Sequence, residues 1–337
     1  MARLNVGLIG LGRLGRVYAR DLSTRIGQTR LTAVADTSGD LAQRIAAEFD
    51  VPHAYDDPMR LIEDDTVDAV VVVSPTHTHR PVVNAALGAR KATFCEKPPA
   101  LSLAEAVDMA DAAARTGTFL QMGFMRRFDP GYAAAKQHID DGRIGRPVVF
   151  KSTSRDPFPP SLEYANPKSS GGICIDMGIH DFDLARWFMG DVASVQAAGG
   201  VLVFPELATV GDRDNVIATM TFATGCLGVV DLTRNGYYGY DITTEILGTE
   251  GTIRVGYLRE TPLVIMTRNQ VSHDTVPYFM ERFERAYTRQ LENFADNVLG
   301  GRPAPITIGD GVEALRVAVA ATRACETGAR VEVHTTV

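Results

Sequence analysis

The stretch Val6-Gly-Leu-Ile-Gly-Leu-Gly-Arg-Leu-Gly15 decides the fold of the first half of the chain. A short apolar run, Val6–Ile9, leads into a GxGxxG pattern, and a helical pattern follows. In such a turn the first glycine permits a tight bend, the second lets the backbone approach a pyrophosphate, and the third lets helix and strand pack closely. Amide groups at the helix N-terminus then face the phosphates. The loop predicts a dinucleotide site formed by Gly10, Leu11, Gly12, Arg13, Leu14 and Gly15.

The position of one acidic residue separates a dinucleotide site from an ordinary strand–turn–helix connection. Asp36 ends the second predicted strand, 21 residues beyond Gly15. A carboxylate at this place accepts hydrogen bonds from the ribose hydroxyls of adenosine. It also repels a 2′-phosphate, and the adjacent Thr37 supplies no arginine to bind one. The sequence therefore predicts NAD rather than NADP, with Asp36 and Thr37 in the cofactor site.

The first 122 residues alternate short apolar runs with longer amphipathic stretches. Strands that are apolar throughout and separated by helices are typical of a parallel sheet covered on both faces. Such a sheet binds ligands beyond the carboxyl ends of its strands. We therefore predict an α/β Rossmann dinucleotide-binding domain over residues 1–122. Its expected strands are Val6–Ile9, Leu31–Ala35, Ala69–Val73, Ala92–Cys95 and Phe119–Met122, and its expected helices are Leu14–Arg25, Leu41–Phe49, Val82–Leu87 and Leu103–Arg115.

From residue 123 the pattern changes, and residues 123–337 predict an α+β C-terminal domain with a large, mainly antiparallel open sheet. Glycine-containing turns separate strands over residues 192–266, including a hairpin in which Thr244–Leu247 and Thr252–Val255 flank Gly248–Gly251. The other expected elements are a strand at Pro147–Ser154, a Pro-rich loop that runs to Ser170, and helices at Gly131–Asp140, Asp176–Met189, Tyr278–Leu299 and Gly309–Glu326.

Length, charge and cysteine content argue against a nucleic-acid-binding, secreted or membrane protein. A chain of 337 residues exceeds the size at which one hydrophobic core usually stops growing. A net charge of −7 argues against nucleic acid as a partner, because phosphate neutralisation needs a basic stripe. The N-terminal apolar run is interrupted by glycine and Arg13, so neither a signal peptide nor a membrane span is predicted. Four cysteines without a CxxC pair are expected as free thiols in a reducing cytoplasm: Cys95, Cys174, Cys226 and Cys325.

The segment after the third main strand is expected to line the cofactor cleft. It reads Ser74-Pro-Thr-His-Thr-His79 and places four residues beside the ribose and nicotinamide: Ser74, Pro75, Thr76 and His79. The pair His77 and His79 raises the alternative of a metal site. Neither cysteine nor carboxylate stands at suitable local spacing, so no metal is predicted.

The segment after the fourth strand, Glu96-Lys97-Pro98, carries a candidate catalytic group. A lysine at a strand end beside the cofactor can polarise or protonate a substrate oxygen. We therefore predict that Lys97 contacts both cofactor and substrate, with Glu96 in the cofactor site. The alternative is a surface Glu–Lys pair before a turn.

A third candidate segment is Gly171-Gly-Ile-Cys-Ile-Asp176-Met-Gly-Ile-His180-Asp-Phe-Asp183. At helical spacing Asp176, His180 and Asp183 would project from one face. Carboxylates beside a histidine on a half-buried helix can orient it and keep it basic near neutral pH. The alternative is a capping Asp176 with a hydrogen-bonded core His180.

Together these motifs resemble the glucose–fructose oxidoreductase/inositol dehydrogenase family (Gfo/Idh/MocA) over essentially the whole chain. The resemblance rests on the glycine loop, on Glu96-Lys97-Pro98 and on Asp176 with His180 after Gly171-Gly172. Within the family the chain is most similar to inositol dehydrogenases, through the stretches Gly123–Asp129, Asn235–Asp241 and Arg282–Tyr287.

The resemblance implies roles for individual residues. Lys97 lies beside the oxygen of the reacting carbon, His180 takes the hydroxyl proton, and Asp176 supports this pair. The peptide bond before Pro98 is expected to be cis. Further residues are expected in or near the polyol pocket: Arg127, Arg155, Asp156, Asp183, Tyr238 and Tyr287. Many myo-inositol enzymes have asparagine where Asp156 aligns, which leaves the preferred stereoisomer open.

The family also implies an activity and an assembly. We expect NAD-dependent oxidation of a ring hydroxyl of myo- or scyllo-inositol to a ketone, by a homo-oligomer, dimer or tetramer, that uses the antiparallel sheet for contacts. Two alternatives are a dehydrogenase of a pyranose or another sugar and a non-catalytic NAD-binding sensor. A diphosphate-linked substrate would call for basic residues in the loop at 152–170, which has only Arg155 and Lys168.

Overall fold

The structure, a computed structural model, describes residues 3–335, and the chain divides into two compact units. The first unit contains the residues up to Met125 together with Arg285–Glu313. The second contains Arg126–Glu284 together with the residues from Ala314 onward. This grouping differs from the predicted division after residue 122, because a segment near the end of the chain returns to the first unit.

Aromatic packing explains why Arg285–Glu313 belongs to the first unit. The ring of Phe294 lies edge-on to that of Phe94, with centroids 5.8 Å apart, and both side chains are fully buried. The amide of Met122 also donates to the carbonyl of Ile306 (3.0 Å). Burial of these apolar rings stabilises the return of the chain.

The first unit is built on a six-stranded sheet whose order is β3-β2-β1-β4-β5-β6. Every neighbouring pair in it is parallel. This order, with a switch between β1 and β4, is that of a dinucleotide-binding Rossmann sheet, so the predicted fold of this half is confirmed. The strands are β1 (Leu4–Ile9), β2 (Thr29–Ala35), β3 (His53–Tyr55), β4 (Ala69–Val72), β5 (Ala92–Glu96) and β6 (Leu120–Gly123).

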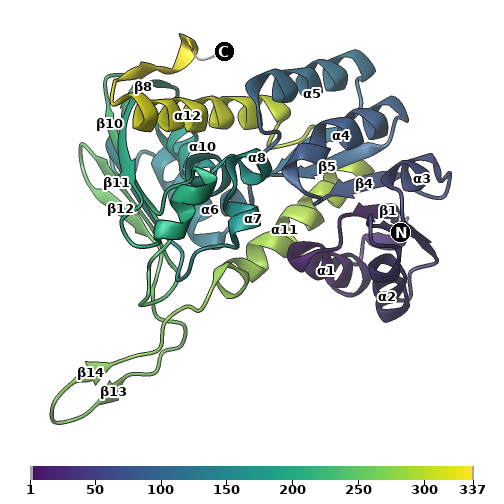
Figure 1. The fold of residues 1–337 in the computed structure, drawn as a ribbon, viewed down its shortest axis with the longest axis horizontal. Helices are drawn as coiled ribbons and strands as arrows, with labels where there is room; N and C mark the ends of the chain where they lie inside the picture. The colour runs from purple at the N-terminus through teal and green to yellow at the C-terminus, as the bar shows by residue number, and fades with distance from the viewer. Residues whose placement is uncertain (1–2, 336–337) are drawn as a thin grey trace. The chain divides into compact units, whose positions relative to one another are not determined.

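The helices of this unit follow the predicted pattern with local differences. The predicted helix Leu14–Arg25 is a shorter α1 followed by a π-helical turn at Asp21–Arg25. In this turn the buried Asp21 accepts from the Thr288 hydroxyl (2.7 Å). The helices are α1 (Arg13–Arg20), α2 (Gly39–Phe49), α3 (Pro58–Glu63), α4 (His79–Gly88), α5 (Leu103–Thr116) and, from Arg285 on, α11 (Phe279–Leu299) (Figure 1).

The second unit contains a seven-stranded sheet of order β12-β11-β7-β10-β9-β8-β15. Only β7 and β10 pair in parallel, so the prediction of a mainly antiparallel sheet is confirmed. Buried and less buried residues alternate along β9 and β11, as expected when one face packs against helices. The strands are β7 (Pro147–Arg155), β8 (Val192–Gly200), β9 (Asn215–Phe222), β10 (Leu227–Thr233), β11 (Asp241–Gly248), β12 (Thr252–Val255) and β15 (Val331–Glu332).

The segment between β7 and β8 is more helical than predicted. The loop expected to reach Ser170 contains two short helices, α7 and α8. The single helix predicted over Asp176–Met189 is divided into α9 and α10. The helices of this unit are α6 (Pro130–Asp140), α7 (Leu162–Ala165), α8 (Pro167–Ser170), α9 (Ile173–Asp176), α10 (Ile179–Met189) and most of α12 (Ile308–Thr327).

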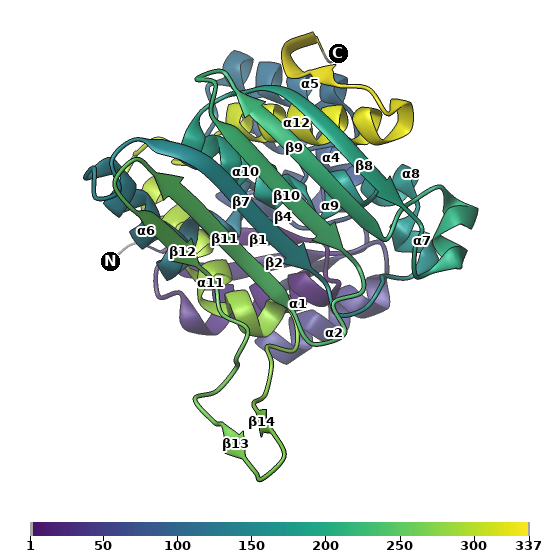
Figure 2. The same cartoon turned by 90° about the vertical axis from the view of Figure 1, so that its left-hand side faces the viewer.

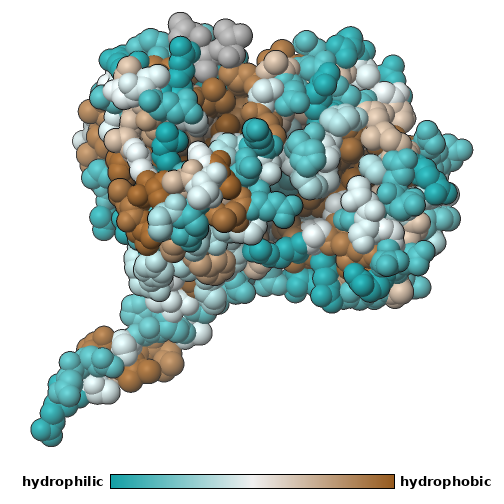
Figure 3. All heavy atoms as spheres, in the orientation of Figure 1, coloured by the Kyte–Doolittle hydropathy of each residue, from teal (hydrophilic) through white to brown (hydrophobic). Residues whose placement is uncertain are grey.

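A small hairpin projects from the second unit. Its strands, β13 (Ile265–Met266) and β14 (Val271–Ser272), pair only with each other and extend beyond the large sheet (Figures 1 and 2). Apolar side chains on this hairpin are exposed, Met266 and Val271 most of all. They form the brown patch on the projecting segment in Figure 3. An isolated two-stranded hairpin is only marginally stable in water. Exposed apolar side chains of this kind are typical of surfaces that become buried in an interaction.

Candidate functional site

The glycine loop of the first unit has the shape that a pyrophosphate requires. Gly10 has a φ of 93°, and a Cβ there would lie 2.6 Å from the backbone of Ser74. A Cβ on Gly15 would lie 2.1 Å from the carbonyl oxygen of Gly10. A Cβ on Gly12, by contrast, would meet no described atom within 4 Å. Close backbone packing therefore requires glycine at positions 10 and 15. Gly12 instead leaves space for the phosphates of NAD at the start of α1.

Asp36 ties this loop to the end of β2. One carboxylate oxygen accepts from the amide of Leu11 (2.9 Å) and the other from the amide of Ser38 (3.0 Å). A carboxylate has about four acceptor positions, so two remain for the ribose hydroxyls of NAD. Asp36 is half-buried and Thr37 is exposed. The residue predicted to select the cofactor thus also fixes the loop that holds the cofactor's phosphates.

His79 links the two strand-end segments of this unit. Its imidazole lies 2.9 Å from the carbonyl oxygen of Ser74 and 2.9 Å from that of Pro98. Burial lowers the pKa of His79, and its hydrogen bonds to backbone carbonyls oppose this shift. The side chain is buried, so its direct role is to hold these segments together. Pro75 is exposed, whereas Ser74 and Thr76 are half-buried.

Glu96, the residue directly before the candidate catalytic lysine, is buried. Its carboxylate accepts from the amide of Lys97 (3.1 Å), from the Tyr18 hydroxyl and from the Gln290 side-chain amide (3.0 Å). Burial raises the pKa of Glu96, and the Tyr18 hydrogen bond partly offsets this shift. The peptide bond between Lys97 and Pro98 is cis, as predicted. The cluster fixes the backbone from which the half-buried Lys97 extends.

Two residues of α11 join this unit, and one of them escaped prediction. Gln290 donates to both Glu96 and the Tyr18 hydroxyl (2.5 Å), but no motif in its surroundings marks it. Tyr287, predicted for the polyol pocket, is buried with its ring centroid 6.1 Å from that of Tyr18. Of the predicted substrate residues, Tyr287 and Lys97 therefore belong to the first unit.

In the second unit Asp176 is the last residue of α9. Its carboxylate accepts from the Tyr164 hydroxyl (2.9 Å) and lies 3.9 Å from the Arg234 guanidinium. The Asp176 carboxylate raises the pKa of Tyr164. The buried Arg234 also forms an ion pair with Asp212 (2.9 Å). Tyr164 and Arg234 were not predicted, because neither belongs to a motif with fixed spacing from Asp176.

His180 is the second residue of α10, so the predicted single helix over Asp176–Met189 is interrupted between Asp176 and His180. Met177 and Gly178 separate it from α9. A Cβ on Gly178 would lie 2.7 Å from the carbonyl oxygen of Cys174, which shows how tightly the turn is packed. His180 is 7% exposed. Asp176 and His180 thus lie on either side of a two-residue break between two helices.

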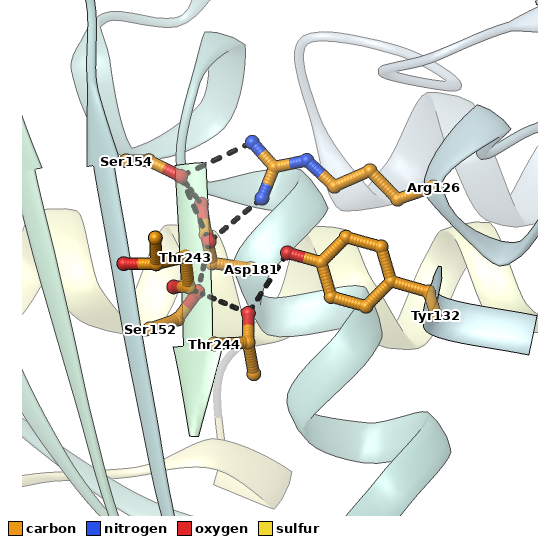
Figure 4. Close-up of polar contacts among 7 residues, drawn as sticks. All are labelled: Arg126, Tyr132, Ser152, Ser154, Asp181, Thr243 and Thr244. Atoms are coloured by element: carbon orange, nitrogen blue, oxygen red, sulfur yellow. Dashed lines mark hydrogen bonds and ion pairs between the residues drawn. The ribbon is translucent and has the colours of Figure 1, made fainter. Parts of the chain in front are cut away.

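A buried polar network anchors the first turn of α10 (Figure 4). Asp181, next to His180 and fully buried, accepts from Arg126 (2.8 Å), Ser152 (2.5 Å) and Ser154 (2.8 Å). Figure 4 shows these side chains converging with Tyr132 and Thr244. Because a buried charge must be paired, this network fixes the backbone that carries His180.

We expect Asp181→Ala to destabilise the second unit strongly. The variant leaves the Arg126 guanidinium buried without its carboxylate, a change that typically costs about 3–5 kcal/mol. Asp191→Ala is the matched control, because Asp191 pairs with Arg186 (2.6 Å) near the other end of α10 with a side chain that is 60% exposed. That pair should contribute less than about 1 kcal/mol. Urea unfolding would measure both, and equal losses would contradict the assigned role of Asp181.

Asp183 and Arg127, both predicted for the substrate pocket, bind each other. The guanidinium donates two hydrogen bonds to the carboxylate (2.6 and 2.9 Å) and lies over the Trp187 ring. Asp183 is almost fully buried, whereas Arg127 is half-buried. Such a bidentate pair holds both side chains in a fixed orientation. Because Arg127 is the more exposed member, it is better placed to meet a ligand.

The remaining predicted substrate residues lie near the end of β7. Arg155 donates to the Tyr238 hydroxyl (2.9 Å) and to Asp231 (2.5 Å). Tyr238 in turn donates to Asp241 (2.8 Å). Asp156 follows directly, and its amide donates to the carbonyl of Thr233 (2.9 Å). Arg155, Asp156 and Tyr238 are thus brought together by the structure.

The described residues contain neither a cluster of metal-binding side chains nor a helix that could cross a membrane. Over residues 3–335, no group of three or more His, Cys, Asp or Glu side chains is arranged to hold a metal ion. Among the helices in that part of the chain, none has the length and apolar character needed to cross a membrane.

Comparison with known proteins covers both units. Residues 4–124 match the family model described as "Oxidoreductase family, NAD-binding Rossmann fold", and residues 136–333 match "Oxidoreductase family, C-terminal alpha/beta domain". The scyllo-inositol 2-dehydrogenase (NAD(+)) of Bacillus subtilis is 38% identical over 98% of this chain and 96% of its own length. The myo-inositol 2-dehydrogenase of Thermotoga maritima is 40% identical over 96% of each chain.

A solved structure of an inositol dehydrogenase has the same fold as this chain. The scyllo-inositol dehydrogenase of Lactobacillus casei, with bound NAD(H) and scyllo-inositol, superposes with a TM-score of 0.94 at 31% identity over 99% of this chain and 100% of the other. The predicted fold class and NAD cofactor are confirmed by these matches and by the sheet order. The chain therefore belongs to the Gfo/Idh/MocA family of NAD-dependent oxidoreductases.

Proposed function

We propose that this protein oxidises a ring hydroxyl of myo- or scyllo-inositol to a ketone, with NAD as the hydride acceptor. The observation that carries the proposal is that the similarity to inositol dehydrogenases extends over the whole chain, including the unit that does not bind the dinucleotide. A cyclic polyol presents hydroxyls around its ring, and the second unit supplies carboxylates, arginines and tyrosine hydroxyls to bind them.

In this proposal His180 is the general base. It removes the proton of the reacting hydroxyl, and Asp176 orients it and stabilises the positive charge that it gains. The hydrogen bond from Tyr164 and the charge of Arg234 keep the Asp176 carboxylate in place. Lys97 stabilises the negative charge that develops on the same oxygen. When bound, NAD accepts the hydride, and the protein's part is to position and polarise the substrate.

The cofactor and substrate sets follow from the same proposal. NAD would contact the loop from Gly10 to Gly15 together with Asp36 and Thr37, the segment Ser74–Thr76 beside His79, and Glu96 with Lys97. The polyol would contact Lys97, His180 and Asp176. Its other ring hydroxyls would be bound by the remaining predicted substrate residues: Arg127, Arg155, Asp156, Asp183, Tyr238 and Tyr287.

A substrate screen tests the proposal directly. The purified protein and NAD are mixed in turn with myo-inositol, scyllo-inositol, D-chiro-inositol and glucose, and NADH formation is followed by absorbance. We expect turnover with at least one inositol and much less with glucose. Turnover with glucose alone would replace inositol by a pyranose, and NADH from none of the four, with NAD binding intact, would overturn the proposal.

We expect cofactor preference to depend on Asp36. The double variant Asp36→Ser, Thr37→Arg removes the charge that repels a 2′-phosphate and adds a cation to bind it. A charge-assisted hydrogen bond contributes roughly 1.5–3 kcal/mol, so the ratio of kcat/KM for NADP over NAD should rise by about tenfold or more. Initial rates with each cofactor measure this ratio.

Asp36→Asn is the control for this experiment, because the asparagine oxygen can still accept from the Leu11 amide. It should lose affinity for NAD without gaining a phosphate ligand. A native enzyme that already prefers NADP would refute the role given to Asp36.

We further propose that the protein assembles as a homo-oligomer, a dimer or tetramer, in the cytoplasm. Figure 2 shows one face of the seven-stranded sheet with no described helix over it. Apolar side chains on this sheet are exposed, among them Ile217, Leu227 and Leu247. Exposed apolar surfaces of this kind are typical of interfaces. All four cysteines are free thiols, which suits a reducing compartment, and sedimentation velocity would measure the assembly.

A further inference from the structure

One buried ion pair contacts both ends of the short helix that carries Asp176. Asp212 lies in the loop before β9 and is 4% exposed, and Arg234 directly follows β10 and is 1% exposed. Their charged groups lie 2.9 Å apart. An Asp212 oxygen accepts from the amide of Ile173 (3.0 Å), the first residue of α9. The Arg234 guanidinium lies 3.9 Å from the carboxylate of Asp176, the last residue of α9.

The backbone before α9 is shaped for this contact. Gly172 has a φ of 77°, a conformation that residues with a side chain rarely adopt. A Cβ at this position would lie 3.0 Å from a carboxylate oxygen of Asp212. Glycine therefore lets the chain pass close enough to the Asp212 carboxylate for the next amide, that of Ile173, to donate to it.

Arg234 is shared unequally between two carboxylates. Its Nη2 atom lies 2.9 Å from Asp212 and 3.9 Å from Asp176. Over residues 3–335, the Nε and Nη2 groups of Arg234 have no aligned hydrogen-bond partner. These groups therefore act on the two carboxylates through charge. Asp212 also draws the cation away from a close ion pair with Asp176.

We propose that Asp212 and Arg234 are positioning residues of the active site, which act on the reaction only through Asp176. The pair fixes the first residue of α9 by a hydrogen bond and the last by charge, and so sets where this helix presents the Asp176 carboxylate. The inference rests on the proposed function, because it assumes that Asp176 orients His180.

Arg234→Met should lower kcat with inositol by about tenfold to a hundredfold, because a displacement of about an ångström can cost roughly a hundredfold in rate. Without the cation the carboxylates of Asp176 and Asp212 repel each other, and the end of α9 shifts. KM should change much less than kcat, since the loss falls on the transition state. Arg234→Lys restores a cation and should recover part of the turnover, which a loss of packing alone would not explain. A loss carried by KM alone would contradict a positioning role.

Arg282→Met is the matched control. Arg282 forms a buried ion pair with Asp129 (2.8 Å), and Asp129 accepts from the amide of Gly131 (3.0 Å) near the start of α6. This pair repeats the arrangement of Asp212 and Arg234 at another helix. Urea unfolding of both methionine variants measures the stability that each pair contributes, so that an effect on α9 is separated from a general loss of stability.

A double variant tests whether Arg234 acts through Asp176. Once Asp176→Asn has removed the carboxylate charge, Arg234→Met should cost little more, so the combined loss in kcat should be far smaller than the product of the single losses. The losses from Arg282→Met and Asp176→Asn should instead multiply, as they do for independent sites. Losses that multiply for Arg234→Met as well would overturn the proposal.

Hydrogen exchange tests the contact with α9 without any assay of activity. Exchange of a peptide covering residues 173–178 is followed by mass spectrometry in the full-length native protein and in the variants. We expect faster exchange in Arg234→Met and Asp212→Ala, and native exchange in Arg282→Met. Native exchange in all three would overturn the proposal. If the native protein oxidises no inositol, the proposed function fails, and exchange still decides whether the pair holds α9.

Discussion

His180→Ala should lose about 10²–10⁴-fold in turnover while still binding NAD, because a positioned general base typically contributes that much to the rate. The substituted residue lies in the second unit, whereas the glycine loop and Asp36 lie in the first, so the cofactor contacts are left intact. The kcat with inositol measures the loss, and quenching or enhancement of NADH fluorescence measures binding.

Two further variants make this result specific. His138→Ala removes an exposed histidine of the same unit and should leave turnover unchanged. Asp176→Asn keeps the shape of the orienting group and should have a milder effect than His180→Ala. Near-normal turnover of His180→Ala from about pH 6 to pH 9 would contradict the assignment, and Lys97 would then become the favoured base.

Local pattern was sufficient to predict the cofactor-binding half. Its central strands are apolar throughout, and its glycine turn lies between a strand and a helix, so periodicity and turn chemistry indicate the same fold. The strand β3 (His53–Tyr55) and the helix α3 (Pro58–Glu63) were missed, since elements this short carry too few residues to show a period.

The second unit shows where local pattern is insufficient. Asp176 and His180 have helical spacing in the sequence, but a packed turn at Gly178 separates their helices. Spacing alone cannot detect that turn, because glycine is tolerated within a helix at modest cost. The helical character of the segment was predicted correctly, and the break between α9 and α10 was not.

Residues that support the site were missed for a different reason. Gln290 contacts Glu96 across 194 positions of sequence, and Arg234 pairs with Asp176 from a later strand end of the second unit. Neither belongs to a motif with fixed spacing, so only tertiary structure identifies it. Local pattern also gave no sign that both oxygens of Asp183 accept hydrogen bonds from Arg127.

Lys97→Met should lower turnover by about 10²–10³-fold, the loss typical when a group that stabilises a developing oxyanion is removed. The methionine keeps most of the length of the side chain and removes its charge. The amide of residue 97 can still donate to Glu96, so the segment before Pro98 should hold its position. Lys151→Met is the matched control, because Lys151 is an exposed lysine paired with Glu245 on the large sheet.

The double variant Lys97→Met, His180→Ala provides the sharpest test of the proposed mechanism. If both side chains act on the same hydroxyl, they serve one transition state, and the second substitution removes stabilisation that the first has already made ineffective. The combined loss in kcat should then be far smaller than the product of the single losses. Losses that multiply would instead show that the two residues act in separate steps, which would contradict a shared hydroxyl. NADH binding, measured on all three variants, keeps a loss of catalysis distinct from a loss of cofactor.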